Sequence, residues 1–194
     1  MRLVLVAFAV AIGVGYLLGG RLSCLSGIKV RWFPLALIGL CLQLAPVPGS
    51  RWPLYLLYAS FVLLVTFAVL NLKVTGFAFI VVGIVLNFAV IAVNSGMPVS
   101  KQSLIDSGQA STLSDLVHAG GVKHHILGPD DNFTFLADVI AVPAPVSQSV
   151  SLGDLFTYGG VGVLIVTAMR RRPPDVSAVT GSSGAPVGGA DERV

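Results

Sequence analysis

The chain has 194 residues, of which 55% are hydrophobic and only 11% are charged, and its formal net charge is +3. Soluble domains carry about 25% charged residues, so this composition excludes an ordinary soluble enzyme domain and indicates an integral membrane protein. The basic residues stand at the ends of apolar runs, where they act as topology determinants, and we expect no binding to nucleic acid.

Five apolar segments are predicted to be transmembrane helices, because a helix of about 20 residues satisfies its own backbone hydrogen bonds in lipid. The second segment contains Gln43 and the fourth contains Asn87. The predicted spans are Leu3–Gly20, Trp32–Val47, Pro53–Leu72, Gly76–Val93 and Leu152–Met169. The expected fold class is therefore an all-α membrane protein of about five transmembrane helices, with an ordered extracytoplasmic loop between spans 4 and 5.

The distribution of basic residues predicts the orientation. The side of the C-terminus would hold Arg21, Lys29, Arg31, Lys73, Arg170, Arg171, Arg172 and Arg193, and the other side only Arg2, Arg51, Lys101 and Lys123. By the positive-inside rule the N-terminus lies outside and the C-terminus lies in the cytoplasm. Residues 1–93 then hold spans 1 to 4, residues 94–151 the outer loop, and residues 152–170 span 5. Residues 171–194 are rich in Pro, Gly, Ser and Ala, which predicts a disordered cytoplasmic tail.

The outer loop is predicted to begin with a sharp turn and two short helices. Gly96 permits a positive φ, and Pro98 forces the preceding residue away from helix, so the chain turns at Asn94–Val99. A short helix is expected over residues 100–107. A second is expected to be capped by Thr112, in the pattern Thr-x-x-acid, and to end at the glycine pair 120–121.

The apolar stretch from Phe133 to Val146 is too short to span a membrane. It contains Asp138 and is broken by Pro143 and Pro145. Apolar runs of about 10 to 14 residues are typically interfacial or re-entrant, and both alternatives stay open.

Three histidines, His118, His124 and His125, are weak candidates for metal ligands. Zinc sites need three or four converging ligands, and the loop also supplies several aspartates. Adjacent histidines point in different directions in regular structure, however, and no His-x3-His spacing is present. We therefore predict no metal and no cofactor, and we expect His125 to be incidental to any site.

Asp154 opens the fifth predicted span in the pattern Ser151-x-x-Asp154. An acidic residue there caps the helix and complements its positive end, or it serves as a functional carboxylate near the outer surface. Deep polar groups within the spans are the uncharged Gln43 and Asn87, which argues against a proton-coupled transporter.

Several of these elements together resemble an uncharacterised family of small multi-pass bacterial membrane proteins, found in Actinobacteria and Firmicutes, whose function is unknown. The resemblance covers roughly residues 1–170, and one departure is that Met97 directly follows Gly96. The matching positions are Asn94, Gly96, Met97, Pro98, His124, Leu136, Asp138, Ile140, Ser151, Gly153 and Asp154. The resemblance implies a location in the bacterial plasma membrane, and it brings no known activity.

Three functional hypotheses remain. The first is a non-enzymatic protein with a capped outer face that serves as an accessory subunit of a membrane protein partner or binds a small ligand. The second is a membrane enzyme or metal protein that acts at the outer face through His124, Asp138 and Asp154, in a cluster that includes Asn94. The third is a small transporter. The first is favoured because no catalytic motif is present.

Overall fold

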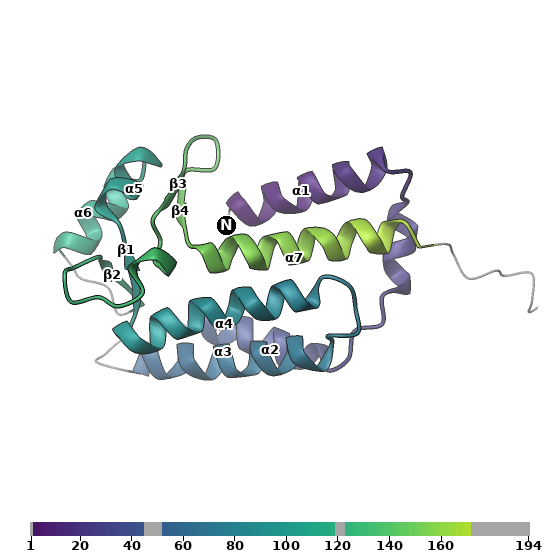
Figure 1. Ribbon diagram of the computed structural model, residues 1–194, viewed down its shortest axis with the longest axis horizontal. Helices are drawn as coiled ribbons and strands as arrows, with labels where there is room; N and C mark the ends of the chain where they lie inside the picture. The colour runs from purple at the N-terminus through teal and green to yellow at the C-terminus, as the bar shows by residue number, and fades with distance from the viewer. Residues whose placement is uncertain (1, 45–51, 119–122, 172–194) are drawn as a thin grey trace, which may run out of the picture.

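The computed structural model describes residues 2–44, 52–118 and 123–171. Within these residues, helices lie side by side in a bundle, and a small cap of short helices and strands covers one end of it (Figure 1). The bundle helices are α1 (Arg2–Leu17), α2 (Phe33–Leu44), α3 (Trp52–Leu70), α4 (Phe77–Asn94) and α7 (Leu152–Met169). The 3-10 helix η1 (Leu22–Gly27) connects α1 to α2 at the end away from the cap.

Three of these helices, α3, α4 and α7, are long and apolar enough to cross a membrane. Helix α1 has 16 residues and ends at Leu17, before the predicted Gly20, and α2 has 12 residues in the described part of the chain. A helix of 12 residues rises about 18 Å, which is less than the roughly 30 Å of a hydrocarbon core. The predicted end of the second span at Val47 lies outside the described residues, as does most of the predicted tail.

The main hydrophobic core joins α3 and α4. Phe61 on α3 stacks on Phe88 of α4 with ring centroids 5.5 Å apart, and Ala68 and Val90 are fully buried. The core continues into the cap through Met97 and Leu136. The cap therefore packs on the ends of the membrane helices and does not form a separate domain.

Helices α4 and α7 approach each other backbone to backbone along a row of glycines. A Cβ on Gly160 would lie 2.8 Å from the carbonyl oxygen of Gly76, and a Cβ on Gly153 would lie 2.7 Å from that of Gly83. Small residues allow such close packing between membrane helices, where van der Waals contact replaces the hydrophobic driving force.

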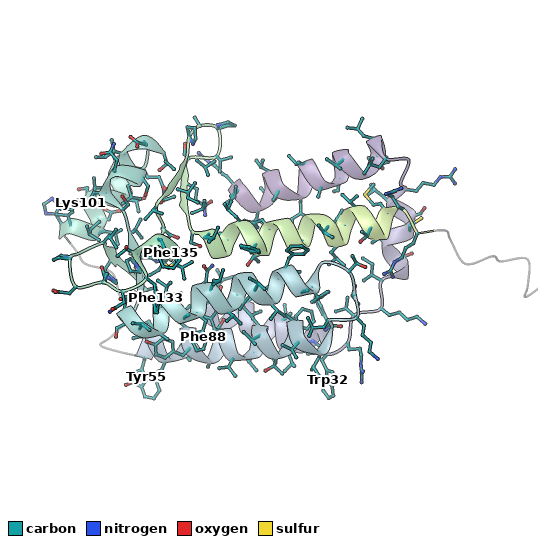
Figure 2. The ribbon with its side chains drawn as sticks, viewed as in Figure 1. Trp32, Tyr55, Phe88, Lys101, Phe133 and Phe135 are labelled. Carbon is teal, nitrogen blue, oxygen red and sulfur yellow. The ribbon has the colours of Figure 1, made fainter. Side chains whose placement is uncertain are left out.

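The cap contains short strands, which an all-α prediction does not include. Strand β1 (Met97–Val99) pairs in parallel with β2 (His124–Ile126), and β3 (Ile140–Val142) pairs antiparallel with β4 (Gln148–Val150). The residues predicted as interfacial or re-entrant form the 3-10 turn η2 (Thr134–Leu136), strand β3 and the turn after it. Figure 2 shows Phe133 and Phe135 where the cap meets the helix ends, and Trp32 at the opposite end.

The two predicted cap helices are present, with one corrected boundary. Helix α5 (Lys101–Asp106) lies within the predicted range 100–107, and the side chain of Ser100 caps it. Helix α6 (Ala110–His118) begins before Thr112, because the amide of Leu113 donates to the carbonyl of Gln109. Thr112 therefore lies in the first turn, and the predicted end at the glycine pair 120–121 falls outside the described residues.

Candidate functional site

Strand β1 brings two of the predicted site residues together. On one side its residue Met97 pairs with His124 of β2, and on the other side Val99 forms a bridge with Asp138. The amide of Asp138 donates to the carbonyl of Pro98, and the amide of Ser100 donates to the carbonyl of Asp138, each over 3.0 Å. The sharp turn after α4 thus serves to send β1 between the segments that carry His124 and Asp138.

The backbone of Asp138 is held firmly. Its carbonyl oxygen accepts hydrogen bonds from the hydroxyls of Ser103, over 3.0 Å, and of Ser149, over 2.9 Å. These two serines are buried and contact each other, so they tie α5 and β4 to the same peptide group. These contacts fix the position of the Asp138 peptide group from two different elements, α5 and β4.

The side chain of Asp138 is the unusual group in the cap. The residue is 8% exposed, and its Oδ1 atom is buried without a hydrogen-bond partner among the described residues. Burial, and next the negative charge of Asp154, raise the pKa of Asp138 to about 8. Its carboxyl group is therefore mostly protonated at neutral pH, because water cannot solvate the ionised form.

A pocket of about 250 Å³ opens beside this carboxyl group. His124 and Asp138 both line it, together with the polar side chains of Gln109, Thr112 and Ser149. Val99, Leu104 and Leu116 supply apolar wall. No sequence signal identified Gln109, Thr112 and Ser149 as pocket residues, because the first two lie at the start of α6 and the third on β4, with no motif in common.

His124 lines the pocket and also keeps exposed surface in the cap. Desolvation lowers the pKa of His124 below 6.5, and the positive charges of Lys123 and His125 add to this effect. The carboxylate of Asp154 acts in the opposite direction. The imidazole is therefore neutral at pH 7 and can both donate and accept a hydrogen bond.

Asp154 belongs to a network beneath the pocket. The predicted cap is confirmed as a full capping box, in which Ser151 Oγ accepts from the Asp154 amide and Asp154 Oδ2 accepts from the Ser151 amide. Asn87 on α4 donates from Nδ2 to Asp154 Oδ1 and accepts from Ser151 Oγ, both over 2.8 Å. The sequence identified Asn87 as a deep polar group but not as a partner of Asp154.

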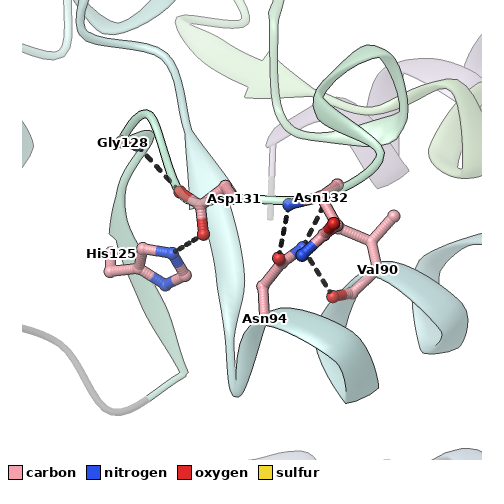
Figure 3. A network of polar contacts seen from close by, with 6 residues as sticks. All are labelled: Val90, Asn94, His125, Gly128, Asp131 and Asn132. Atoms are coloured by element: carbon pink, nitrogen blue, oxygen red, sulfur yellow. Dashed lines mark hydrogen bonds and ion pairs between the residues drawn. The ribbon is translucent and has the colours of Figure 1, made fainter.

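Asn94 and His125 lie in a different network (Figure 3). Asn94 Oδ1 accepts from the amide of Asn132, and its Nδ2 donates to the carbonyls of Asn132 and Val90. His125 Nε2 contacts Asp131 Oδ1 over 2.9 Å, and Asp131 Oδ2 accepts from the Gly128 amide. These contacts shape the loop after β2, so Asn94 is a loop anchor in this structure and does not line the pocket.

The third histidine, His118, is exposed at the end of α6 and takes no part in lining the pocket. Within residues 2–44, 52–118 and 123–171, no group of three His, Cys, Asp or Glu side chains is arranged to hold a metal ion. The pocket is therefore characterised by hydrogen-bonding groups and one buried carboxyl group.

These features define a class: a protein of apolar, membrane-length helices with a polar pocket in a cap at one end of the bundle. Residues 27–166 match the model of a family of unknown function (DUF5317), and the chain belongs to this family. Comparison with curated proteins and with solved structures gives no match. The pocket, Asp138 and Asp154 all lie within the matched residues, and so does His124.

Proposed function

We propose that this protein is a multi-pass membrane protein that binds a small ligand with a primary amine or ammonium group in the cap pocket. The observation that carries the proposal is that Asp138 lines the 250 Å³ pocket while its buried Oδ1 has no hydrogen-bond partner among the described residues. Buried polar atoms almost always have a partner, so a carboxyl group with an unpartnered oxygen beside a pocket is expected to receive one from a ligand.

Charge complementarity selects the amine. Two carboxyl groups, Asp138 and Asp154, interact electrostatically at the site, and the nearby imidazole of His124 has a lowered pKa. An ammonium group beside Asp138 would favour its ionised form and would relieve its repulsion with Asp154. The same carboxyl groups would repel an anionic ligand. His124 and Gln109 remain available to orient other polar groups of the ligand.

The test is thermal unfolding of the purified protein in mild detergent with methylamine, ethanolamine or acetate. Both amines should raise the midpoint in a saturable manner, since a ligand that binds only the folded state stabilises it. Asp138→Asn should remove this response. Asp106→Asn, an exposed aspartate on α5, is the charge-matched control and should keep it. Equal responses of the two variants, or no response of the parent protein, would contradict the proposal.

The proposed topology has five membrane passes, with the cap outside a bacterial plasma membrane and the C-terminus in the cytoplasm. It is supported by the alternation of the five bundle helices, since α1, α3 and α7 all begin at the cap end (Figure 1). Arg21, which follows α1, and Arg170, which follows α7, then lie at the opposite end. The exposed Phe133 and Phe135 would lie at the outer membrane–water interface.

A cysteine-accessibility experiment tests this orientation. In intact cells, a membrane-impermeant maleimide should label Asp106→Cys in the cap. It should label Arg171→Cys only after the cells are lysed. The reverse pattern would place the cap in the cytoplasm.

An enzyme acting through His124, Asp138 and Asp154 is the second candidate function. It is favoured by the opposite pKa shifts of two groups that share a pocket, an arrangement typical of acid–base pairs. Among the described residues, however, no hydrogen bond joins His124 to a hydroxyl or thiol that could act as a nucleophile. Mass spectrometry of a bound amine after long incubation separates the two: an unchanged ligand supports binding, and a modified one supports catalysis.

A further inference from the structure

A second cavity, apolar and larger, runs along the bundle beside the cap pocket. It is a groove of about 570 Å³ between α1 and α7. Small residues form its floor, namely Ala7 and Ala11 on α1 and Gly159 and Gly162 on α7. Larger apolar side chains such as Val10 and Val163 form its sides.

The groove has the shape for a hydrocarbon chain and not for another helix. Helices α1 and α7 contact each other through Ala11, Ile165 and Met169, and the amide of Arg21 donates to the Met169 carbonyl. The groove is thus a furrow on the surface of a closed helix pair. A helix with its side chains is about 10 Å across, whereas a single alkyl chain needs only the depth that glycine and alanine leave free.

The groove and the cap pocket share a wall. On strand β4, Ser149 lines the pocket, while the next residue, Val150, lines the groove together with Val142 of β3. Successive side chains of a strand point to opposite faces, which explains this division. Leu155, the residue after Asp154 on α7, also lines the groove. The cap end of the groove therefore lies against the β3–β4 hairpin and the first turn of α7.

We propose that the ligand is a membrane amphiphile, an amine with a long alkyl chain, whose chain lies in the α1–α7 groove and whose amine reaches Asp138 around the end of the β3–β4 hairpin. This inference rests on the proposed function for the identity of the head group. The apolar groove selects the chain, and the unpartnered carboxyl oxygen selects the head group. A ligand of this kind would enter the groove sideways from the bilayer.

The experiment uses the full chain in lipid nanodiscs and a dodecylamine that carries a photoreactive diazirine in the middle of its chain. After illumination, mass spectrometry should locate adducts on the groove walls of α1 and α7. An excess of unlabelled dodecylamine should remove them. Labelling of the lipid-facing residues Leu40 on α2 and Val62 on α3 serves as the background.

Two glycine substitutions form a matched pair. A Cβ at Gly159 or at Gly13 meets no atom within 4 Å, so a side chain can begin at both positions without a clash at Cβ. Only Gly159 lines the groove. Gly159→Leu should lower groove labelling about fivefold or more, the factor that modest overpacking of a binding site gives. Gly13→Leu should leave labelling unchanged.

The outcomes separate this inference from the proposed function. Groove labelling that is equal to background, that resists competition, or that Gly159→Leu leaves intact overturns the inference. If methylamine still stabilises the protein in that case, the proposed function stands alone. If methylamine has no effect while groove labelling is saturable and unchanged in Asp138→Asn, the groove binds a chain without the head-group contact, and the amine assignment is overturned.

Discussion

Asn87 and Asp154 are joined by a hydrogen bond of 2.8 Å from the amide nitrogen of Asn87 to Oδ1 of Asp154, across the interface of α4 and α7. The same asparagine accepts a hydrogen bond from Ser151, the residue that caps α7. One side chain of a membrane-length helix therefore holds both members of the capping box. The position of Asp154 beneath the pocket depends on α4 as much as on its own helix.

Asn87→Leu should destabilise the protein, because Asp154 Oδ1 and Ser151 Oγ both lose their partner. The expected loss is about 1–3 kcal/mol, the usual cost of leaving a partly buried polar group unsatisfied. Chemical unfolding in detergent micelles measures it. Thr66→Val removes a hydroxyl that bonds within its own exposed helix turn and should change stability little. Equal effects of the two substitutions would show that the α4–α7 contact has no special role.

Gly83→Ala should loosen the packing of α4 on α7. A Cβ there would collide with Thr157 and with the carbonyl of Gly153, a backbone group that cannot move aside. Overpacking of this kind costs about 1–3 kcal/mol. Gly159→Ala adds the same methyl group to α7 where no atom lies within 4 Å, and it should be neutral or slightly stabilising. The midpoint of thermal unfolding distinguishes the two variants.

Asp138 should make the protein less stable as the pH rises. Its pKa is about 8 in the folded protein against an ordinary value of 3.8, so the folded state holds this proton more tightly than the unfolded state. The corresponding stability is complete below pH 3.8 and is lost between pH 3.8 and 8, with a slope of at most about 1.4 kcal/mol per pH unit. Asp138→Asn should flatten this part of the pH profile. An unchanged slope in the variant would show that Asp138 titrates normally.

His124 should make the protein less stable as the pH falls below 6.5. Its pKa is lowered from 6.5 by desolvation and by Lys123 and His125, against the charge of Asp154, so the folded state binds the proton less well than the unfolded state. Its contribution is complete above pH 6.5 and is lost as the pH falls. His124→Gln should therefore reduce the loss of stability below pH 6.5, measured by unfolding at pH 5 to 7. If the variant loses as much stability below pH 6.5 as the parent protein, the loss arises from other groups.

Asn94→Ala should release the loop after β2 and leave the pocket in place. Both polar atoms of the Asn94 side chain contact the backbone of Asn132, and alanine leaves the Asn132 amide without this partner. Hydrogen exchange of the Asn132 amide should accelerate by about tenfold, the factor for a loss near 1.4 kcal/mol. Binding of methylamine should stay close to that of the parent protein, because Asn94 does not line the pocket. Loss of binding would instead connect the loop to the site.

The features that the sequence predicted well are local. Three of the predicted spans coincide with membrane-length helices, and the capping pattern at Ser151 is present in full. Each depends only on composition or spacing within a single turn or a single helix. The rest of the chain therefore has little influence on it. The first predicted span ends earlier in the structure, at Leu17 and not at Gly20, because apolar composition does not fix where a helix stops.

The site itself is non-local, and the sequence could name His124 and Asp138 without showing how they meet. His124 and Asp138 are brought together by strands of three residues, which are too short to carry an alternating pattern. The pairing of β1 with β2 joins segments 27 positions apart, from Met97 to His124. Thr112, Gln109 and Ser149 reach the pocket only because of that arrangement. Asn94 was grouped with the site by resemblance and is instead a neighbour that holds the adjoining loop.

The parallel pairing of β1 with β2 also distinguishes two chemically identical side chains. Met97 lies opposite His124 and Pro98 opposite His125, so one imidazole lines the pocket and the other contacts Asp131. A shift of the strand by one residue would exchange them, because neighbouring side chains of a strand point to opposite faces. The register of β1 and β2 thus determines which histidine lines the pocket, since the two rings are chemically identical.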